Sequence, residues 1–522
     1  MTRAATLPAG VLVLAVLAAH VSLYPKIADL DSFYHIGHAA AYAEGSLFDT
    51  SFPWGTQSAV ADHGADLWWG FHILLLPLAI GDVEWGIRVG ALALTALLLA
   101  TFHHVARRHG AGHAIWWTAA FFVAVPNVLF REIMLRPHVV SLAGALLLLS
   151  VLVRGRWWQA MLVSAAIAWL HLGLAWVAPG IAAAYAFVRA VEHAVGSKEG
   201  RGSVPPLAAV VAALAGTAIG WVLRPHPLQA LELGSVQIIR LLAAKATEEP
   251  LTFSAEISPL SARDLVAMSA LFLVVWLGAV VTAVYGALTA KLGRPEERRL
   301  LFTSLLVSTA FLGLALLSAR RAMEYWVAFG CLALPFLAPV ASTWFRGRVV
   351  RAVAVALIAL HVGWASWRHG LNVRLVASPP DTMAGVASFL LEESAPGDIV
   401  FHAKWDNFGP LFAHNRSNRY LGGMDPIFQF AHDPQLYWEF FYVSADLNTD
   451  WTCNAFPCAS GSTVDTHVAL REHFRARWVV VEPWRNPRFT LYLLNDVRYR
   501  LAHETQREAV FEVLPPSEGP AA

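Results

Sequence analysis

The chain has 522 residues, of which 57% are hydrophobic and only 14% are charged, with a mean hydropathy of +0.51. Soluble domains carry about 25% charged residues, so this composition excludes an ordinary soluble protein and indicates an integral membrane protein. The net charge of +1 excludes a nucleic-acid-binding protein that relies on charge. Residues 371–522 carry 12 Lys and Arg against 18 Asp and Glu. We therefore expect a basic transmembrane body, residues 1–370, and an acidic soluble α/β domain, residues 371–522.

Apolar runs long enough to cross a membrane recur along the first 370 residues. A lipid core about 30 Å thick is crossed by about 20 helical residues. Residues 157–188 are too long for one span and fit two short helices with a break near Leu172 and Gly173. About eleven transmembrane helices are therefore predicted, and the first is interpreted as a retained helix rather than a signal peptide. The other runs are residues 7–24, 86–106, 114–130, 137–153, 205–223, 263–290, 300–318, 322–342 and 349–368.

Lys and Arg collect in loops that fall on one side if eleven helices alternate. Short loops rich in these residues stay in the cytoplasm. We therefore expect a multi-pass protein of the plasma (inner) membrane with a cytoplasmic N-terminus and an exoplasmic tail. The basic positions are Arg107 with Arg108, Arg154 with Arg156, and the segments 189–201, 291–299 and 346–351. The segments then placed outside are 25–85, 131–136, 224–262, Arg320 with Arg321, and the tail.

The first exoplasmic loop, residues 25–85, begins with two acids, Asp29 and Asp31. Such a pair can bind a divalent cation such as Mg²⁺ or Mn²⁺, or one acid can act as an acid or base towards an acceptor. Alternatively, either acid caps a helix that starts at Ser32. The apolar segment 67–80 of the loop is predicted to lie on the membrane surface or dip into it.

Farther along this loop, Asp62, His63 and Asp66 lie near Trp54 and Trp68. Carboxylates, an imidazole and indole faces suit a sugar-binding site. The tryptophans also suit an interfacial belt, so both interpretations stay open.

The second exoplasmic turn contains Arg131, Glu132 and Arg136. Charged side chains between two spans must face water or one another, because lipid does not solvate them. Glu132 could join Asp29 and Asp31 across one cavity, also as a metal ligand. Alternatively, Arg131 and Glu132 form a surface ion pair.

A third charged group, Arg320, Arg321 and Glu324, lies where the tenth predicted span begins. The planar fork of arginine matches phosphate oxygens, so a lipid-borne phosphate is one expected partner. Alternatively, the arginines extend to lipid headgroups.

The tail shows short buried-strand patterns at 398–401, 478–481 and 509–514. Cys453 and Cys458 lie in a polar, turn-rich segment of it and form either a local disulfide or two free thiols. A disulfide would place the tail in an oxidising compartment.

The layout resembles the GT-C superfamily of integral-membrane glycosyltransferases. It is similar to protein O-mannosyltransferases, the aminoarabinose transferase of lipid A and the oligosaccharyltransferase catalytic subunit. The residues that carry this likeness are Asp29, Asp31, and the aromatic and polar pair Tyr34 and His35 that follows. The tail has no WWDYG-type motif, which argues against peptide N-glycosylation and leaves the acceptor open.

This resemblance implies transfer of a hexose or pentose from a polyprenyl-phosphate-linked donor to a glycan, lipid or protein acceptor on the exoplasmic side. Asp29 or Asp31 would be the catalytic acid or base, Glu132 a second acid, and Arg320 or Arg321 the contact to the carrier phosphate. The expected substrate-binding residues are Tyr34, His35, Asp62, His63, Arg131, Arg136, Arg320, Arg321 and Glu324.

Two other classes fit parts of the pattern. A transporter or flippase would show inverted repeats and charges near the membrane midplane, whereas the charges here gather at one boundary. A scaffold with an exoplasmic binding domain would leave the acids of the first loop unexplained. No nucleotide-binding motif and no nucleic-acid partner is indicated.

Overall fold

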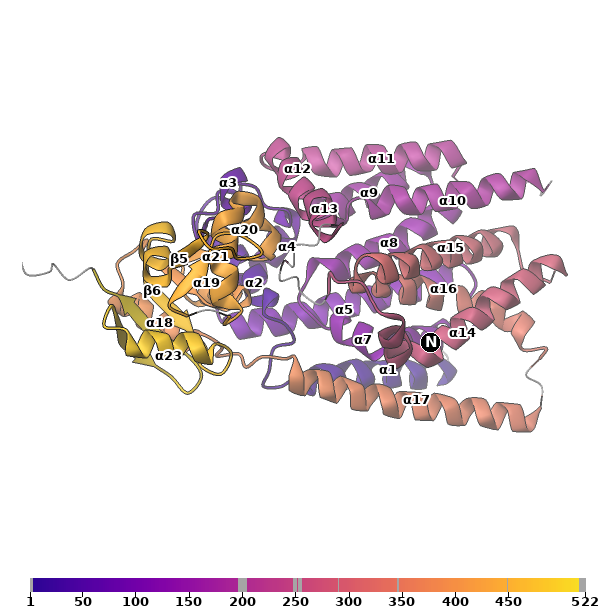
Figure 1. Ribbon diagram of the computed structural model, residues 1–522. Helices are drawn as coiled ribbons and strands as arrows, with labels where there is room; N and C mark the ends of the chain where they lie inside the picture. The colour runs from indigo at the N-terminus through magenta and orange to yellow at the C-terminus, as the bar shows by residue number, and fades with distance from the viewer. Residues whose placement is uncertain are drawn as a thin grey trace, which may run out of the picture. The chain divides into compact units, whose positions relative to one another are not determined.

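The computed structural model describes residues 3–195, 204–246, 251, 256–289, 291–344, 347–447 and 449–515. The chain forms two compact units, whose elements are labelled in Figure 1. The helical unit comprises Met1–Ala28, Arg88–Arg224 and Ala255–Ala377, and the sheet unit comprises Asp29–Ile87, Pro225–Ser254 and Ser378–Ala522. The first loop, which the sequence assigned to the membrane body, thus groups with the tail.

The helical unit consists of apolar helices, because a helix satisfies its backbone hydrogen bonds internally, as a lipid core requires. Among the described residues, seven helices could cross a membrane by length and composition, or up to nine if each bent pair is one span. The polytopic helical architecture is confirmed, but the predicted count of eleven is not. The helices are α1 (Arg3–Val21), most of α5 (Val83–Arg108), α6 (Ala114–Val123), α7 (Pro126–Glu132), α8 (Pro137–Arg154), α9 (Trp157–Leu170), η1 (Leu172–Leu174), α10 (Val177–Ala194), α11 (Pro206–Val222), α14 (Ala262–Leu288), α15 (Pro295–Leu317), η3 (Arg320–Ala322), α16 (Met323–Ala341) and α17 (Arg348–Leu375).

Two breaks in these helices have local causes. Helices α6 and α7 meet at 99°, and Pro126 begins α7. Proline has no backbone N–H and disfavours a helical residue before it, and Val125 is accordingly extended. The predicted break near Leu172 is confirmed, since the short η1 separates α9 from α10.

Four of the five basic segments meet at one end of the helical unit. Arg154 pairs with Glu296 (Nε to Oε2, 2.9 Å) and also donates to the carbonyl of Arg108. Arg299 pairs with Glu192 near the end of α10 (Nε to Oε2, 2.7 Å). This common end agrees with the expectation that these loops face one compartment, and the identity of that compartment stays a prediction.

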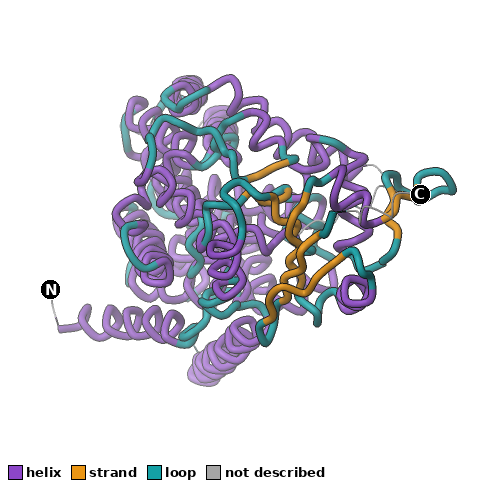
Figure 2. Tube along the Cα trace, turned by 90° about the vertical axis from the view of Figure 1, so that its left-hand side faces the viewer, coloured by secondary structure: helices purple, strands orange, loops and turns teal. Residues whose placement is uncertain are grey.

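The sheet unit contains a six-stranded sheet in the order β1-β3-β2-β6-β8-β7, shown in orange in Figure 2. The first four strands are parallel, and β8 and β7 add as antiparallel strands. The three strands predicted from sequence are confirmed as β2, β6 and β8. Their apolar side chains pack in a core with Phe401, Val479 and Phe511. The strands are β1 (Gly55–Thr56), β2 (Ile399–His402), β3 (Arg419–Leu421), β6 (Ala476–Val481), β7 (Tyr499–Glu504) and β8 (Ala509–Val513).

Strand β1 comes from the first loop and pairs with β3 of the tail. Gly55 lies opposite Tyr420, and the Gly422 amide donates to the Thr56 carbonyl at 2.8 Å. After β3 the chain turns sharply at Gly422 and Gly423, whose φ angles of 63° and 100° favour glycine. The first loop is therefore part of the fold of the sheet unit.

A separate two-stranded sheet and several helices complete this unit. Strands β4 (Trp451–Cys453) and β5 (Thr463–Asp465) are antiparallel, and Cys453 forms a disulfide with Cys458. Of the two alternatives for these cysteines, the disulfide is confirmed. The predicted apolar segment of the first loop is helix α4 (Trp69–Ala79). The other helices are α2 (Asp31–Glu44), α3 (Ala59–His63), α12 (Pro227–Ser235), η2 (Val236–Arg240), α13 (Leu241–Ala246), α18 (Ala384–Glu393), η4 (Trp405–Asn407), α19 (Phe408–His414), α20 (Pro426–His432), α21 (Pro434–Ser444), α22 (Thr466–Val468), η5 (Ala469–His473) and α23 (Pro487–Asn495).

Candidate functional site

Asp29 and Asp31 lie at the start of α2, in the sheet unit, and both are half-buried. The helix begins at Asp31, and Leu30 occupies the N-cap position without a side-chain hydrogen bond. Neither acid therefore occupies the N-cap position itself. As a first-turn residue, Asp31 is stabilised by the partial positive charge of the helix N-terminus. Ser32 contacts Asp29, with its Oγ 3.5 Å from Oδ2.

The next residues of α2 lie in a buried polar cluster. The hydroxyl of Tyr34 is 2.9 Å from His38 Nδ1, and His35 Nδ1 is 2.9 Å from His72 Nε2. His72 Nδ1 in turn lies 2.6 Å from Asp66 Oδ2. Each of these five residues is at most 5% exposed to solvent. Tyr34 and His35 thus have internal partners, and their contact with substrate stays a prediction.

The protonation states in this cluster follow from burial and charge. Burial alone raises the pKa of Asp66, but the imidazoles of His72 and His38 and the hydrogen bonds it accepts hold that pKa well below its usual range. Burial lowers the pKa of His38 to about 3. The pKa of Tyr34 is raised by burial and by the nearby carboxylates. At neutral pH the cluster therefore holds an ionised Asp66, a neutral His38 and a neutral Tyr34.

Asp62 and His63 belong to the surface of the sheet unit. Asp62 Oδ2 lies 2.6 Å from His432 Nδ1 of α20, and His63 Nδ1 lies 3.2 Å from Glu232 Oε2 of α12. The carboxylates of both pairs are substantially exposed. Such pairs add little stability, so Asp62 and His63 can exchange these partners for a ligand at low cost.

The helical unit has a second charged cluster, built from α7, α8, α16 and the segment before α14. Arg131 pairs with both Glu324 and Glu256, and Arg136 Nη1 lies 2.9 Å from Glu256 Oε2. His138 Nε2 is 3.7 Å from Glu324 Oε2. Burial raises the pKa of Glu256, but the guanidinium groups of Arg131, Arg136 and Arg321 outweigh it and hold that pKa well below its usual range. The sequence placed Arg131, Arg136 and Glu324 at one boundary, and the structure brings them together.

Glu132 does not pair with its neighbour Arg131, so the surface-pair alternative is wrong. Its residue is only 1% exposed, and neither carboxylate oxygen has a hydrogen-bond partner among the described residues. Only its backbone carbonyl is bound, by the Thr95 hydroxyl at 2.9 Å. A buried carboxyl group without a partner costs free energy, and such groups persist where function requires them.

The two arginines of η3 have different surroundings. Arg320 Nη2 lies 3.0 Å from Asp264 Oδ2 of α14. The Arg321 side chain makes no hydrogen bond or ion pair with any residue that the structure describes. Its backbone amide donates to the Glu256 carbonyl at 3.0 Å, which anchors it beside the Glu256 cluster.

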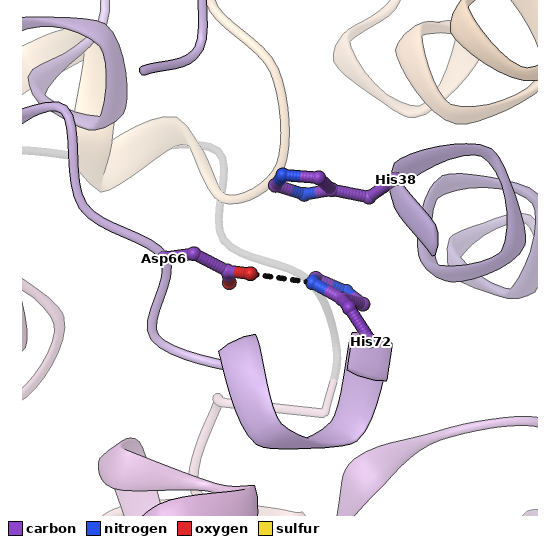
Figure 3. A group of neighbouring side chains, drawn as sticks. All are labelled: His38, Asp66 and His72. Atoms are coloured by element: carbon purple, nitrogen blue, oxygen red, sulfur yellow. Dashed lines mark hydrogen bonds and ion pairs between the residues drawn. The ribbon is translucent and has the colours of Figure 1, made fainter. Parts of the chain in front are cut away.

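The candidate metal ligands predicted from sequence fall in different units: Asp29 and Asp31 in one, and Glu132 in the other. The prediction that these acids share a cavity with Arg321 joins both units and stays a prediction. In the described part of the chain, a different group has metal-ligand geometry: His38, Asp66 and His72, drawn in Figure 3. Sequence reasoning missed it because His72 lies within the apolar run of α4, where no spacing marks a ligand.

The fold is similar to those of solved glycosyltransferases. The crystal structure of ArnT from Cupriavidus metallidurans bound to undecaprenyl phosphate matches with a TM-score of 0.53 and 14% identity, over 98% of this chain and 99% of that one. The crystal structure of its apo state matches with a TM-score of 0.53 and 15% identity, over 98% of this chain and 100% of that one. The crystal structure of the Archaeoglobus fulgidus oligosaccharyltransferase in complex with Zn and sulfate matches with a TM-score of 0.50 and 12% identity, over 97% of this chain and 74% of that one.

No protein-family model and no curated protein matches the sequence. The structural likeness covers nearly the whole chain. The chain therefore shares the fold of ArnT and of the oligosaccharyltransferase.

Proposed function

We propose that the chain is a glycosyltransferase that moves a hexose or pentose from a polyprenyl-phosphate-linked donor to an acceptor on the exoplasmic side of the membrane. The observation that carries this proposal is the likeness in fold, over 98% of the chain, to ArnT bound to undecaprenyl phosphate. A donor of this kind brings its own leaving group, which agrees with a sequence that shows no nucleotide-binding motif. The acceptor is a glycan, a lipid or a protein.

The reaction needs a base for the acceptor and a cation for the departing phosphate. Asp29 or Asp31 would take the acceptor proton, since both carboxylates are half-buried at the start of a helix. Glu132 would serve as the second acid, because its carboxyl group has no structural partner among the described residues. Fixed charges directed at the atoms that change charge usually supply much of the rate enhancement.

Arg321 is the better of the two candidates for the carrier phosphate. Arg320 is paired with Asp264, whereas the Arg321 guanidinium lies near enough to lower the pKa of Glu256 but makes no direct ion pair with a described residue. A guanidinium can bind two phosphate oxygens at once. A phosphate contact at Arg321 therefore breaks no direct ion pair with a described residue.

We expect Arg321→Ala to weaken donor use much more than Arg320→Ala. The assay measures transfer of labelled sugar from a polyprenyl-phosphate donor by purified protein, with donor concentration varied. Loss of a charge-assisted contact worth about 1.5–3 kcal/mol would lower kcat/KM roughly 10- to 100-fold. Arg320→Ala is the matched control, with a change of a few-fold expected. Equal effects of both substitutions would remove Arg321 from its assigned role.

The proposal also requires the tail to be exoplasmic and the N-terminus to be cytoplasmic. The Cys453–Cys458 disulfide supports an oxidising compartment for the tail. Protease added to sealed, right-side-out membrane vesicles is therefore expected to digest an epitope at the C-terminus and to spare one at the N-terminus. A C-terminal epitope that becomes sensitive only in inverted vesicles would refute this topology.

A further inference from the structure

Three side chains of the sheet unit bring possible ligand atoms close together. His38 comes from α2, Asp66 from the loop before α4, and His72 from α4 itself (Figure 3). One nitrogen of each imidazole and one oxygen of the carboxylate all lie within 4.8 Å of one another. The residues are 2%, 5% and 0% exposed. Two imidazoles and one carboxylate thus converge in a place that bulk water does not reach.

Each of these ligands is oriented by a neighbour. The second nitrogen of the His72 ring, Nε2, lies 2.9 Å from His35 Nδ1, which leaves Nδ1 facing Asp66. His38 Nδ1 lies 2.9 Å from the Tyr34 hydroxyl. In the tautomer whose Nδ1–H donates to Tyr34, the Nε2 lone pair of His38 is available. Metal-binding histidines usually have such a partner on the other ring nitrogen, because it holds the ring and its tautomer.

The carboxylate is held as firmly as the imidazoles. Tyr42 donates its hydroxyl to Asp66 Oδ2 at 3.0 Å, and the Trp68 amide donates to Oδ1 at 2.8 Å. These two bonds fix the carboxylate plane without using all of its lone pairs. Asp66 can therefore keep both contacts and still bind a cation through Oδ2.

We infer that His38, Asp66 and His72 bind a single Zn²⁺ ion that joins α2 to the segment 66–72. A tetrahedral zinc ion keeps nitrogen and oxygen ligands roughly 3.4 Å apart, because each lies about 2.0–2.2 Å from the metal. His72 Nδ1 and Asp66 Oδ2 are now 2.6 Å apart across a shared proton. Replacing that proton by the ion increases the distance between the two atoms by less than about 1 Å, and small side-chain rotations can accommodate this change.

The ligand types favour zinc over the Mg²⁺ or Mn²⁺ expected at Asp29 and Asp31. Magnesium prefers six oxygen ligands and keeps several waters, which a buried pair of imidazoles does not provide. Imidazole nitrogen with one carboxylate is a common zinc ligand set. The three side chains supply three of the four tetrahedral ligands, and a single water would complete the set. The inference adds to the proposed transfer reaction without depending on it.

The ion would order the part of α2 that carries the candidate acid. Asp31 and His38 are two helical turns apart, so they lie on the same face of α2. Holding His38 on Asp66 and His72 would fix the position of Asp31 relative to the rest of the first loop.

The first test uses the unaltered, full-length protein in detergent. Elemental analysis after equilibration with zinc buffer and gel filtration is expected to find one zinc per chain, and cobalt in its place should give the visible absorption bands of tetrahedral Co²⁺. X-ray absorption at the zinc edge should show two imidazole ligands. A folded protein that takes up no zinc, or whose zinc edge shows no imidazole, would overturn the inference.

The second test compares variants by zinc affinity. His38→Gln, Asp66→Asn and His72→Gln are each expected to weaken binding more than about 100-fold, because loss of even an outer partner costs 10- to 100-fold. His473→Gln is the matched control, since His473 also pairs with a carboxylate, Glu439, at 2.8 Å but has no second imidazole there. Unchanged affinity in folded ligand variants, or an equal loss in the control, would contradict the assignment.

Discussion

Asp31→Asn is expected to reduce sugar transfer by about 10²- to 10⁴-fold, which is the usual contribution of a general base. Asparagine has nearly the same shape as aspartate but cannot accept the acceptor proton. Asp31 is half-buried in the first turn of α2, and asparagine can occupy the same space. The fold should therefore persist while the rate falls. The measurement is label transfer from a polyprenyl-phosphate sugar by purified protein at saturating donor.

Asp29→Asn made in parallel identifies which acid is the base, because the base variant should lose kcat and its neighbour should mainly change KM. Asp49→Asn is the matched control. Asp49 is an exposed acid of the same loop whose carboxylate accepts the Ser51 amide at 3.0 Å. It should retain transfer within about two-fold, as expected for a surface change. Full activity in both Asp29→Asn and Asp31→Asn would refute the glycosyltransferase proposal.

Arg131→Met is expected to destabilise the protein by about 3–5 kcal/mol, because it leaves a buried carboxylate without its partner. The side chain of Glu324 is only 3% exposed, and Arg131 also binds Glu256. In the wild-type protein Arg131 contacts both carboxylates, and Arg136 shares Glu256 with it. The loss should be measured as the change in the free energy of unfolding in mixed micelles.

A double-mutant cycle separates the ion pair from packing. Glu324→Gln added to Arg131→Met should recover part of the lost stability, since the unpaired charge disappears. Arg416→Ala is the control, because Arg416 pairs with Glu44, whose side chain is 63% exposed. Surface pairs contribute about 0–1 kcal/mol. If Arg131→Met were no worse than Arg416→Ala, the cluster would not be a stabilising network.

Much of the helical unit could be predicted, because each span is a local property. An apolar run of sufficient length must be helical in lipid, and α8, α14 and α15 lie where such runs occur. The break near Leu172 was predictable for the same reason, since 157–188 is too long for a single span. Strand β1 was not, because the two residues Gly55 and Thr56 carry no periodic pattern.

The sites divide in the same way. The acids and arginines of the segments predicted to be exoplasmic were recognisable in sequence, because charged residues beside an apolar run are costly unless they face water or one another. Their partners were not: Glu256 binds Arg131 across more than a hundred residues, and Asp264 holds Arg320.

The amino-acid sequence by itself determined the membrane class, the apolar helices and the charged residues at their ends, because hydrophobicity and helix length are set by neighbouring residues. Only the tertiary structure decided which charges pair, that the first loop joins the sheet of the tail, and that His38, Asp66 and His72 converge. Contacts between distant segments depend on how whole helices and strands pack, and no local pattern encodes that packing.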